Sequence, residues 1–171
     1  ITDRVKTFNE RIYYNTDLIH SAINSERKIT FRYYMYNTAK DKKFKNEGRP
    51  YEVSPYALVY SDDNYYLLAN YPKYDGITHF RVDKMTDIGI LDERCADVSG
   101  VTGGKFNPDD YVKRVFNMFK GRTENVGLEC SEELLGAVLD KFGDNVFLRK
   151  QSGNSYALTV KADVGPTFYA W

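Results

Sequence analysis

The stretch NYYLLANYPKYDGITHFRVDKM, residues 64–85, consists of two short runs of apolar and aromatic residues joined by a turn signal. A proline and a glycine bracket that turn in the segment PKYDG, which predicts an antiparallel β-hairpin. Side chains alternate between the two faces of a strand, so three hydrogen-bonding groups of the second run should share one face: His79, Arg81 and Asp83. The opposite face would supply the core, with Phe80, Val82 and Lys84.

Runs with the same period of two precede and follow this hairpin. They are KITFRYYMY at 28–36, YEVSPYALVY at 51–60 and DIGILD at 87–92. Two connections between them, AKDKKFKNEG and SDDN, have the polar composition of hairpin loops. Five short strands in a row without a crossover helix predict a small antiparallel β-barrel of the Sm or SH3 type, because closure removes exposed strand edges.

Helical patterns flank the predicted barrel. Apolar residues recur at helical spacing over residues 4–13 and again after Asn15 and Thr16, either of which can cap the second helix. After the barrel, the segment FNPDDYVKRVFNMF predicts another helix. Asn107 is its N-cap, Pro108 is its first residue, and its apolar positions recur through Phe119.

From residue 125 the expected order of elements is β, α, β, β. NVGLEC is the first strand, SEELLGAVLDKFG is a helix capped by Ser131 and ended by Gly143, and NVFLRK pairs with YALTVKA across a turn. This order is most of a ferredoxin-like unit, whose second helix and last strand would follow Trp171.

The predicted fold class is therefore α+β: a small Sm/SH3-like antiparallel β-barrel with flanking helices, followed by an incomplete ferredoxin-like βαββ unit. We expect four divisions along the chain. They are a helical linker at 1–16, the barrel domain at 17–97, a second helical linker at 98–124 and a truncated C-terminal domain at 125–171.

The 171 residues are 42% hydrophobic, which is enough for packed cores. Cys95 and Cys130 lie far apart and outside any CxxC pattern, so we expect free thiols and neither a disulfide framework nor a metal site. No catalytic motif, phosphate loop or dinucleotide fingerprint is present, which predicts a protein without catalytic residues or a cofactor. No apolar run is long enough for a membrane span and no secretory signal is visible, so a cytoplasmic location is expected.

The formal net charge of zero hides a basic segment, Arg27–Arg49, in which eight basic residues outnumber two acidic ones. Such an excess can attract anions, although a lysine-rich tip at residues 40–45 is also typical of a solvated loop. Two interpretations are likewise open for Arg81. It could form an ion pair with Asp83 or Asp63, or it could bind a phosphate in two-pronged geometry beside the hairpin tyrosines.

Four motifs in this order resemble the WYL domain of bacterial transcription regulators: AINSERKITFRYY, SPYALVY, NYYLLANY and THFRVDKM, over about residues 18–91. The Trp-Tyr-Leu triplet that names the family stands here as Tyr65, Tyr66 and Leu67. The segment VGLECSEELLGAVLDKFG and the residues after it resemble the C-terminal extension that accompanies such domains. The resemblance implies an Sm-like barrel with a ligand-sensing role, and a promoter-binding helix-turn-helix domain before Ile1.

Carried over motif by motif, the resemblance implies a set of ligand-binding residues. They are Ser54, Tyr56, Tyr66, His79, Arg81 and Lys84, with Arg32 as an addition. Two positions depart from the family pattern. Tyr65 replaces the tryptophan, which concerns packing more than recognition, and Lys84 stands where the family more often has arginine, so a point charge replaces a two-pronged fork.

The sequence thus predicts the effector-sensing and assembly region of a bacterial WYL-type transcription regulator, without enzymatic activity. Its ligand would be single-stranded nucleic acid or a nucleotide-like anion. The whole protein would bind promoter DNA as a homodimer through its helix-turn-helix domain. The alternative is a ligand-free homodimerisation or protein-interaction module, because tyrosine and arginine also dominate interface hot spots.

Overall fold

The computed structural model describes residues 11–171, which divide into two compact units between Phe106 and Asn107. The helix predicted over residues 4–13 lies for the most part outside the described residues. The second predicted helix belongs to α1 (Arg11–Asn24), which runs without a break through Asn15. Asn15 is not a cap, because its buried Nδ2 donates to the Met85 carbonyl at 3.2 Å and so ties α1 to the sheet.

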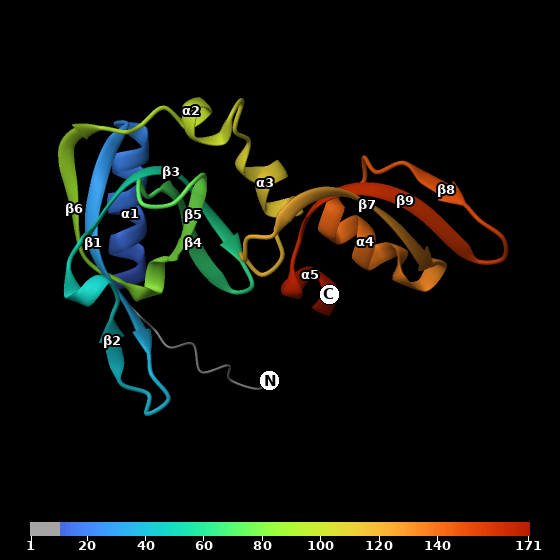
Figure 1. Ribbon diagram of the computed structural model, residues 1–171, viewed down its shortest axis with the longest axis horizontal. Helices are drawn as coiled ribbons and strands as arrows, with labels where there is room; N and C mark the ends of the chain where they lie inside the picture. The colour runs from blue at the N-terminus through green and yellow to red at the C-terminus, as the bar shows by residue number, and fades with distance from the viewer. Residues whose placement is uncertain (1–10) are drawn as a thin grey trace. The chain divides into compact units, whose positions relative to one another are not determined.

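The first unit is a strongly curled antiparallel sheet with α1 packed against it (Figure 1). Its strands are β1 (Arg27–Tyr36), β2 (Lys42–Phe44), β3 (Tyr51–Ser61), β4 (Asn64–Asn70), β5 (Ile77–Arg81) and β6 (Met85–Arg94). Their order is β2-β1-β3-β4-β5, and β6 pairs with β1 on the side away from β3, since Ile29 lies opposite both Val53 and Ile90. This is the α+β, Sm-like fold that the sequence predicts.

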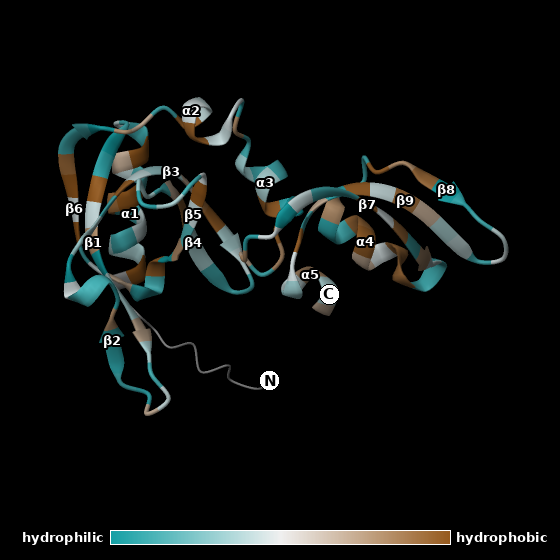
Figure 2. Cartoon of the chain, in the orientation of Figure 1, coloured by the Kyte–Doolittle hydropathy of each residue, from teal (hydrophilic) through white to brown (hydrophobic). Residues whose placement is uncertain are grey.

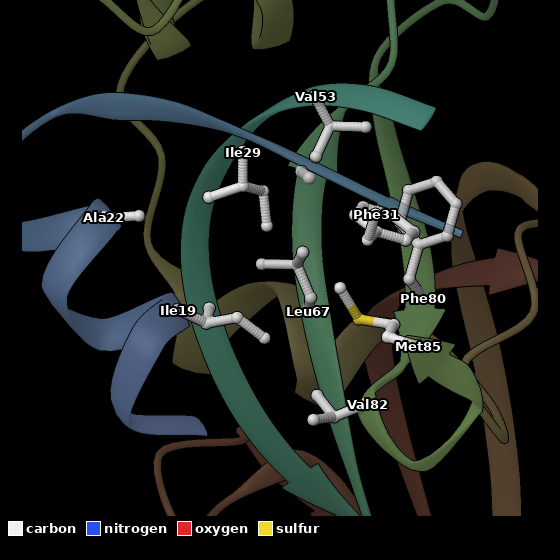
Figure 3. Close-up of a cluster of buried hydrophobic side chains, with 10 residues drawn as sticks. Ile19, Ala22, Ile29, Phe31, Val53, Leu67, Phe80, Val82 and Met85 are labelled. Atoms are coloured by element: carbon white, nitrogen blue, oxygen red, sulfur yellow. The ribbon is translucent and has the colours of Figure 1, made fainter. Parts of the chain in front are cut away.

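The inner face of this sheet and one face of α1 enclose the hydrophobic core (Figure 3). The buried residues are Ile19, Ala22, Ile29, Phe31, Val53, Leu67, Ala69, Phe80, Val82 and Met85. Alternation along β1 holds, because Ile29 and Phe31 are buried whereas Arg32 is exposed. Each large side chain in this core stabilises the fold by about 1.5–3 kcal/mol.

The second strand of the quoted hairpin is shorter than predicted. β5 ends at Arg81, and Val82–Lys84 form a single 3-10 turn, η2, that leads into β6. The turn breaks the expected alternation: Val82 is buried, but Asp83 folds back onto Arg81. A turn is needed here because β6 must pass from the end of β5 to the far edge of β1.

The lysine-rich loop contains a strand that sequence reasoning missed. β2 continues the pairing of β1, with Tyr34 opposite Phe44 and Tyr36 opposite Lys42. We call residues 34–45 the β1–β2 ribbon. It projects from the sheet (Figure 1), and the colouring of Figure 2 shows that β2 is mainly hydrophilic. A short helical turn, η1 (Asn46–Gly48), connects it to β3, and α2 (Val98–Thr102) follows β6.

In the second unit, Asn107 caps α3 (Pro108–Arg114) as predicted, with its Oδ1 accepting from an N–H of the first helical turn at 2.9 Å. The helix is shorter than the apolar spacing indicates. The chain leaves it at Val115, and a tight turn brings Phe116 opposite Phe119. Val115 and Phe116 are nevertheless buried, so the apolar residues after the helix still serve the core.

A three-stranded antiparallel sheet forms the rest of this unit. Its strands are β7 (Arg122–Ser131), β8 (Leu148–Lys150) and β9 (Ser155–Val164). The helical elements of the unit after β7 are η3 (Glu132–Leu134), α4 (Leu135–Phe142) and α5 (Pro166–Ala170). The order β7-β9-β8 places the last strand between the other two, which is the ferredoxin-like arrangement of a βαββ sequence. Ser131 is the last residue of β7 and, contrary to prediction, its side chain caps no helix.

Candidate anion-binding site

Arg81, at the end of β5, binds the carboxylate of Asp83 with two parallel hydrogen bonds. Its Nε donates to Oδ1 at 3.0 Å and its Nη2 to Oδ2 at 2.9 Å, and Nη2 also donates to Asn64 Oδ1. The hydrogen bonds to Asp83 raise the pKa of Arg81. The ion pair that the sequence left open is therefore present. The remaining nitrogen, Nη1, makes no hydrogen bond to the residues that the structure describes.

Three tyrosines surround this ion pair. Tyr66 of β4 lies opposite Arg81 in the strand ladder. The Tyr33 hydroxyl accepts from the Arg81 backbone N–H at 3.2 Å, and the Tyr34 hydroxyl donates to the Asp83 carbonyl at 3.0 Å. Neighbouring residues of a strand point to opposite faces, so Tyr33 and Tyr34 hold η2 from two sides. Burial raises the pKa of all three hydroxyls.

Lys84 is the last residue of η2 and is half-buried. Its ammonium group forms no ion pair or hydrogen bond with any residue from 11 to 171. Burial, followed by the nearby charge of Arg81, lowers the pKa of Lys84. Asp83 acts in the opposite direction, but its carboxylate is already bound by Arg81. The turn and the end of β5 therefore carry two cations and one carboxylate, and the carboxylate of Asp62 lies near enough to Tyr66 to raise the pKa of its hydroxyl.

This arrangement can bind an anion and has no feature of a catalytic centre. An ammonium group and the outer edge of a guanidinium group can share the oxygens of one phosphate. Tyrosine adds a hydroxyl donor and an aromatic ring at the same place, and a ring suits a nucleobase as well as a packing partner. The site of Arg81, Lys84 and the three tyrosines is called the η2 site below.

Ser54 and Tyr56 lie elsewhere on the barrel. Both are on β3 and hold the segment after β6: Ser54 Oγ accepts from the Ala96 N–H at 2.9 Å, and the Tyr56 hydroxyl donates to the Ala96 carbonyl at 2.9 Å. Burial raises the pKa of Tyr56 to about 12. Ser54 is opposite Asn70 on β4. Asn70 is four residues from Tyr66 along the same strand, so about 13 Å separates these two residues. Their observed contacts are structural.

The other two predicted residues lie on different strands, β5 and β1. His79 is half-buried on β5, two residues before Arg81 and opposite Leu68. Arg32 is on the outer face of β1, where its Nη2 lies 2.7 Å from Asp87 Oδ2. The Arg32 guanidinium also lies over the ring of Phe44, 5.0 Å from the ring centre, so Arg32 belongs to the base of the ribbon.

Sequence reasoning missed Tyr33 and Tyr34 as members of the η2 site, and Asn64 as a partner of Arg81. The segment FRYYMY did carry a signal, because two consecutive tyrosines on a strand present one hydroxyl to each face. Their partners could not be read from local sequence. The hydrogen bonds of Tyr33 and Tyr34 to η2 join residues that are 48 and 49 positions apart.

Among residues 11–171 no three His, Cys, Asp or Glu side chains are grouped so that they could hold a metal ion. Over the same residues, no helix combines the length and the apolar character that crossing a membrane requires. Cys95 and Cys130 are free thiols.

The strongly curled antiparallel sheet with its flanking helix defines the class of Sm-like domains. A model of the WYL domain matches residues 15–90. Residues 15–90 of the chain are therefore identified as a WYL domain.

Among solved structures, the chain is similar to proteasome accessory factor B/C (PafBC) of Arthrobacter aurescens, with 16% sequence identity and a TM-score of 0.47. The similarity covers 92% of this chain and 22% of that chain, so this chain spans about a fifth of the other's length. No curated protein matches the chain.

Proposed function

We propose that this chain is the effector-sensing and assembly region of a bacterial transcription regulator. Its barrel binds a nucleic-acid or nucleotide-like anion at the η2 site and thereby controls DNA binding by a helix-turn-helix domain of the same regulator. The role is regulatory and not catalytic. The WYL domain supports this role, and one observation carries the ligand class: the half-buried ammonium of Lys84 beside Arg81, with no counter-ion among the described residues.

A partly buried cation that forms no ion pair with the described residues opposes folding, as the lowered pKa of Lys84 indicates, and we attribute its presence to a ligand. A phosphate group restores the missing counter-charge. The same ligand competes with Asp83 for Arg81, and this competition offers a means of signalling. Lys84 precedes Met85, whose carbonyl accepts from Asn15 of α1 at 3.2 Å. A ligand that favours one position of η2 would therefore favour one position of α1.

Lys84→Met is expected to weaken the binding of short single-stranded oligonucleotides about tenfold or more, because it removes one charge-assisted contact. The slope of log affinity against log salt should also become shallower by about 0.7. Fluorescence anisotropy with labelled strands at two salt concentrations measures both. The matched control is Lys73→Met, which removes an exposed lysine of the β4–β5 turn. An equal loss in both variants would show that only total charge matters.

The lowered pKa of Lys84 determines how folding stability and ligand affinity should change with pH. The folded protein binds this proton less well than the unfolded chain does, so protonated Lys84 opposes folding below its folded-state pKa and the penalty fades as pH rises toward 10.5. Lys84→Met should therefore not lower the melting temperature at neutral pH. Ligand affinity should fall on the alkaline side of neutrality, before an ordinary lysine would titrate.

Asp83→Asn is expected to strengthen oligonucleotide binding several-fold, because the carboxylate that competes for Arg81 is removed while the side-chain shape is kept. The cost in stability should be small, about 1 kcal/mol, since both partners of the pair are about one third exposed. Anisotropy and thermal melting of the same sample separate the two effects. If affinity falls in this variant, Arg81 acts only as a structural tie to Asp83.

The alternative function is homodimerisation without a ligand. The exposed rings of Tyr60 and Tyr65 favour it, since they pack against each other with centres 5.0 Å apart at the β3–β4 hairpin. Sedimentation analysis with and without an oligonucleotide distinguishes the two functions. A dimer that is insensitive to salt and to the oligonucleotide supports the alternative, whereas salt-dependent oligonucleotide binding supports the first.

A further inference from the structure

The β1–β2 ribbon carries cations and aromatic rings in alternation on one face. The Arg32 guanidinium lies over Phe44, and the Phe44 ring meets Tyr34 edge-on at 6.2 Å. Lys42 Nζ lies 4.6 Å from the centre of the Tyr34 ring, and the ring of Tyr36 is 5.7 Å from that of Tyr34. These contacts fix the rings and cations in place before any ligand arrives.

The strand register decides which lysines share this face. Tyr36 lies opposite Lys42, and Met35 lies opposite Lys43. Opposed residues of an antiparallel pair are on the same side, so Lys42 accompanies the tyrosine rings and Lys43 is on the other side. The four lysines of the ribbon form no ion pair with any of the described residues: Lys40, Lys42, Lys43 and Lys45. Arg32, by contrast, is partly neutralised by Asp87.

The row of rings continues directly into the η2 site. Tyr34 belongs to both, because its hydroxyl donates to the Asp83 carbonyl while its ring packs against Tyr36 and Phe44. The last two rings are open to solvent, with Tyr36 56% and Phe44 38% exposed. Tyr34 therefore connects the turn that carries Lys84 with these two exposed rings.

We propose that the ribbon binds single-stranded nucleic acid as a continuation of the η2 site. Unpaired bases stack on Tyr36 and Phe44, and the phosphates between them lie beside Lys42. Stacked bases and interleaved cations are how proteins hold single strands without reading their sequence. This inference rests on the proposed anion site for one end of the strand. It adds that the ligand is an oligomer that crosses the ribbon, not a single nucleotide.

Strand length is the first test. A labelled thymidine dinucleotide and a thymidylate strand of about 12 nucleotides are compared by fluorescence anisotropy with the full chain. The longer strand is expected to bind at least about tenfold more tightly, because stacked bases add to the anchored phosphate. Equal affinities would overturn the role of the ribbon. They would leave the proposed function standing, since the dinucleotide would still bind at Lys84.

Two lysines of one strand provide the matched variants. Lys42→Ala should remove most of the length advantage, whereas Lys43→Ala should change it less than about twofold, because both remove one charge but from opposite faces. Equal losses would mean undirected attraction and would overturn the proposal. Neither variant should change dinucleotide affinity, which Lys84→Met should lower about tenfold or more. If no strand of either length binds the wild-type chain, the proposed function fails as well.

The rings are tested with Tyr36→Ala and Tyr36→Phe. The first should lower the affinity of the longer strand about tenfold, and the second should restore it, since the ring and not the hydroxyl does the stacking. Tyr36 is exposed, so the melting temperatures of both variants should match that of the wild type. If Tyr36→Ala instead weakens self-association and leaves strand binding unchanged, the ribbon is a protein contact and the proposal is wrong.

Discussion

Leu67→Ala is expected to lower the free energy of unfolding of the chain by about 2–5 kcal/mol. The Leu67 side chain is fully buried between α1 and the sheet and is surrounded by regular backbone that cannot collapse into the space it leaves (Figure 3). Phe80 and Leu58 lie opposite Leu67 on the two neighbouring strands. Urea denaturation followed by circular dichroism measures the loss.

Leu134→Ala is the matched control, because it makes the same chemical change at a side chain that is 58% exposed. It should cost less than about 0.5 kcal/mol. The pair also separates packing from binding. Leu67 neighbours Tyr66 but lies on the core side, so Leu67→Ala should bind oligonucleotides normally at temperatures where it is still folded. A loss below 1 kcal/mol would contradict the packing of the barrel described above.

Asp163→Ala is expected to destabilise the second unit by about 3 kcal/mol. Asp163 is only 5% exposed, and Arg114 Nε lies 2.8 Å from its Oδ1. That N–H is not directed at the carboxylate, so the two form an ion pair without a hydrogen bond. The Thr123 hydroxyl donates to the same oxygen at 2.7 Å. Removing the carboxylate leaves Arg114 partly buried without a counter-ion, and this unpaired cation is the main cost.

Asp163→Asn keeps an acceptor for Thr123 and should fall between the wild type and the alanine variant in chemical denaturation. The comparison with a surface pair is direct, because Arg122 and Glu124 form an ion pair on the same sheet with side chains 86% and 45% exposed. Glu124→Ala should cost less than about 1 kcal/mol. If Asp163→Ala costs no more than Glu124→Ala, the buried pair does not hold α3 to β9.

Much of the barrel could be predicted because its signals are local. Alternating runs and turn chemistry act over a few residues, and they indicated β1, β3, β4 and β6 with small errors at their ends. The errors arise where a tertiary contact overrides the local pattern. Asn15 reads as a cap but is used to bind Met85, and Val82–Lys84 reads as strand but turns so that the chain can reach β1.

For the candidate site, too, the sequence predicted some features and tertiary contacts decided the others. The sequence by itself determined the class of the domain, through its resemblance to the WYL domain. The same resemblance selected Arg81, Lys84 and Tyr66, and local turn and strand patterns place all three on or next to one hairpin. Only the tertiary structure decided what Arg81 binds, that Ser54 lies with Ala96 instead, and that Tyr33 and Tyr34 complete the site. The physical reason is the curl of the sheet: it brings β1 against η2 across nearly fifty residues of chain, and no pattern within one strand records which strand it will meet.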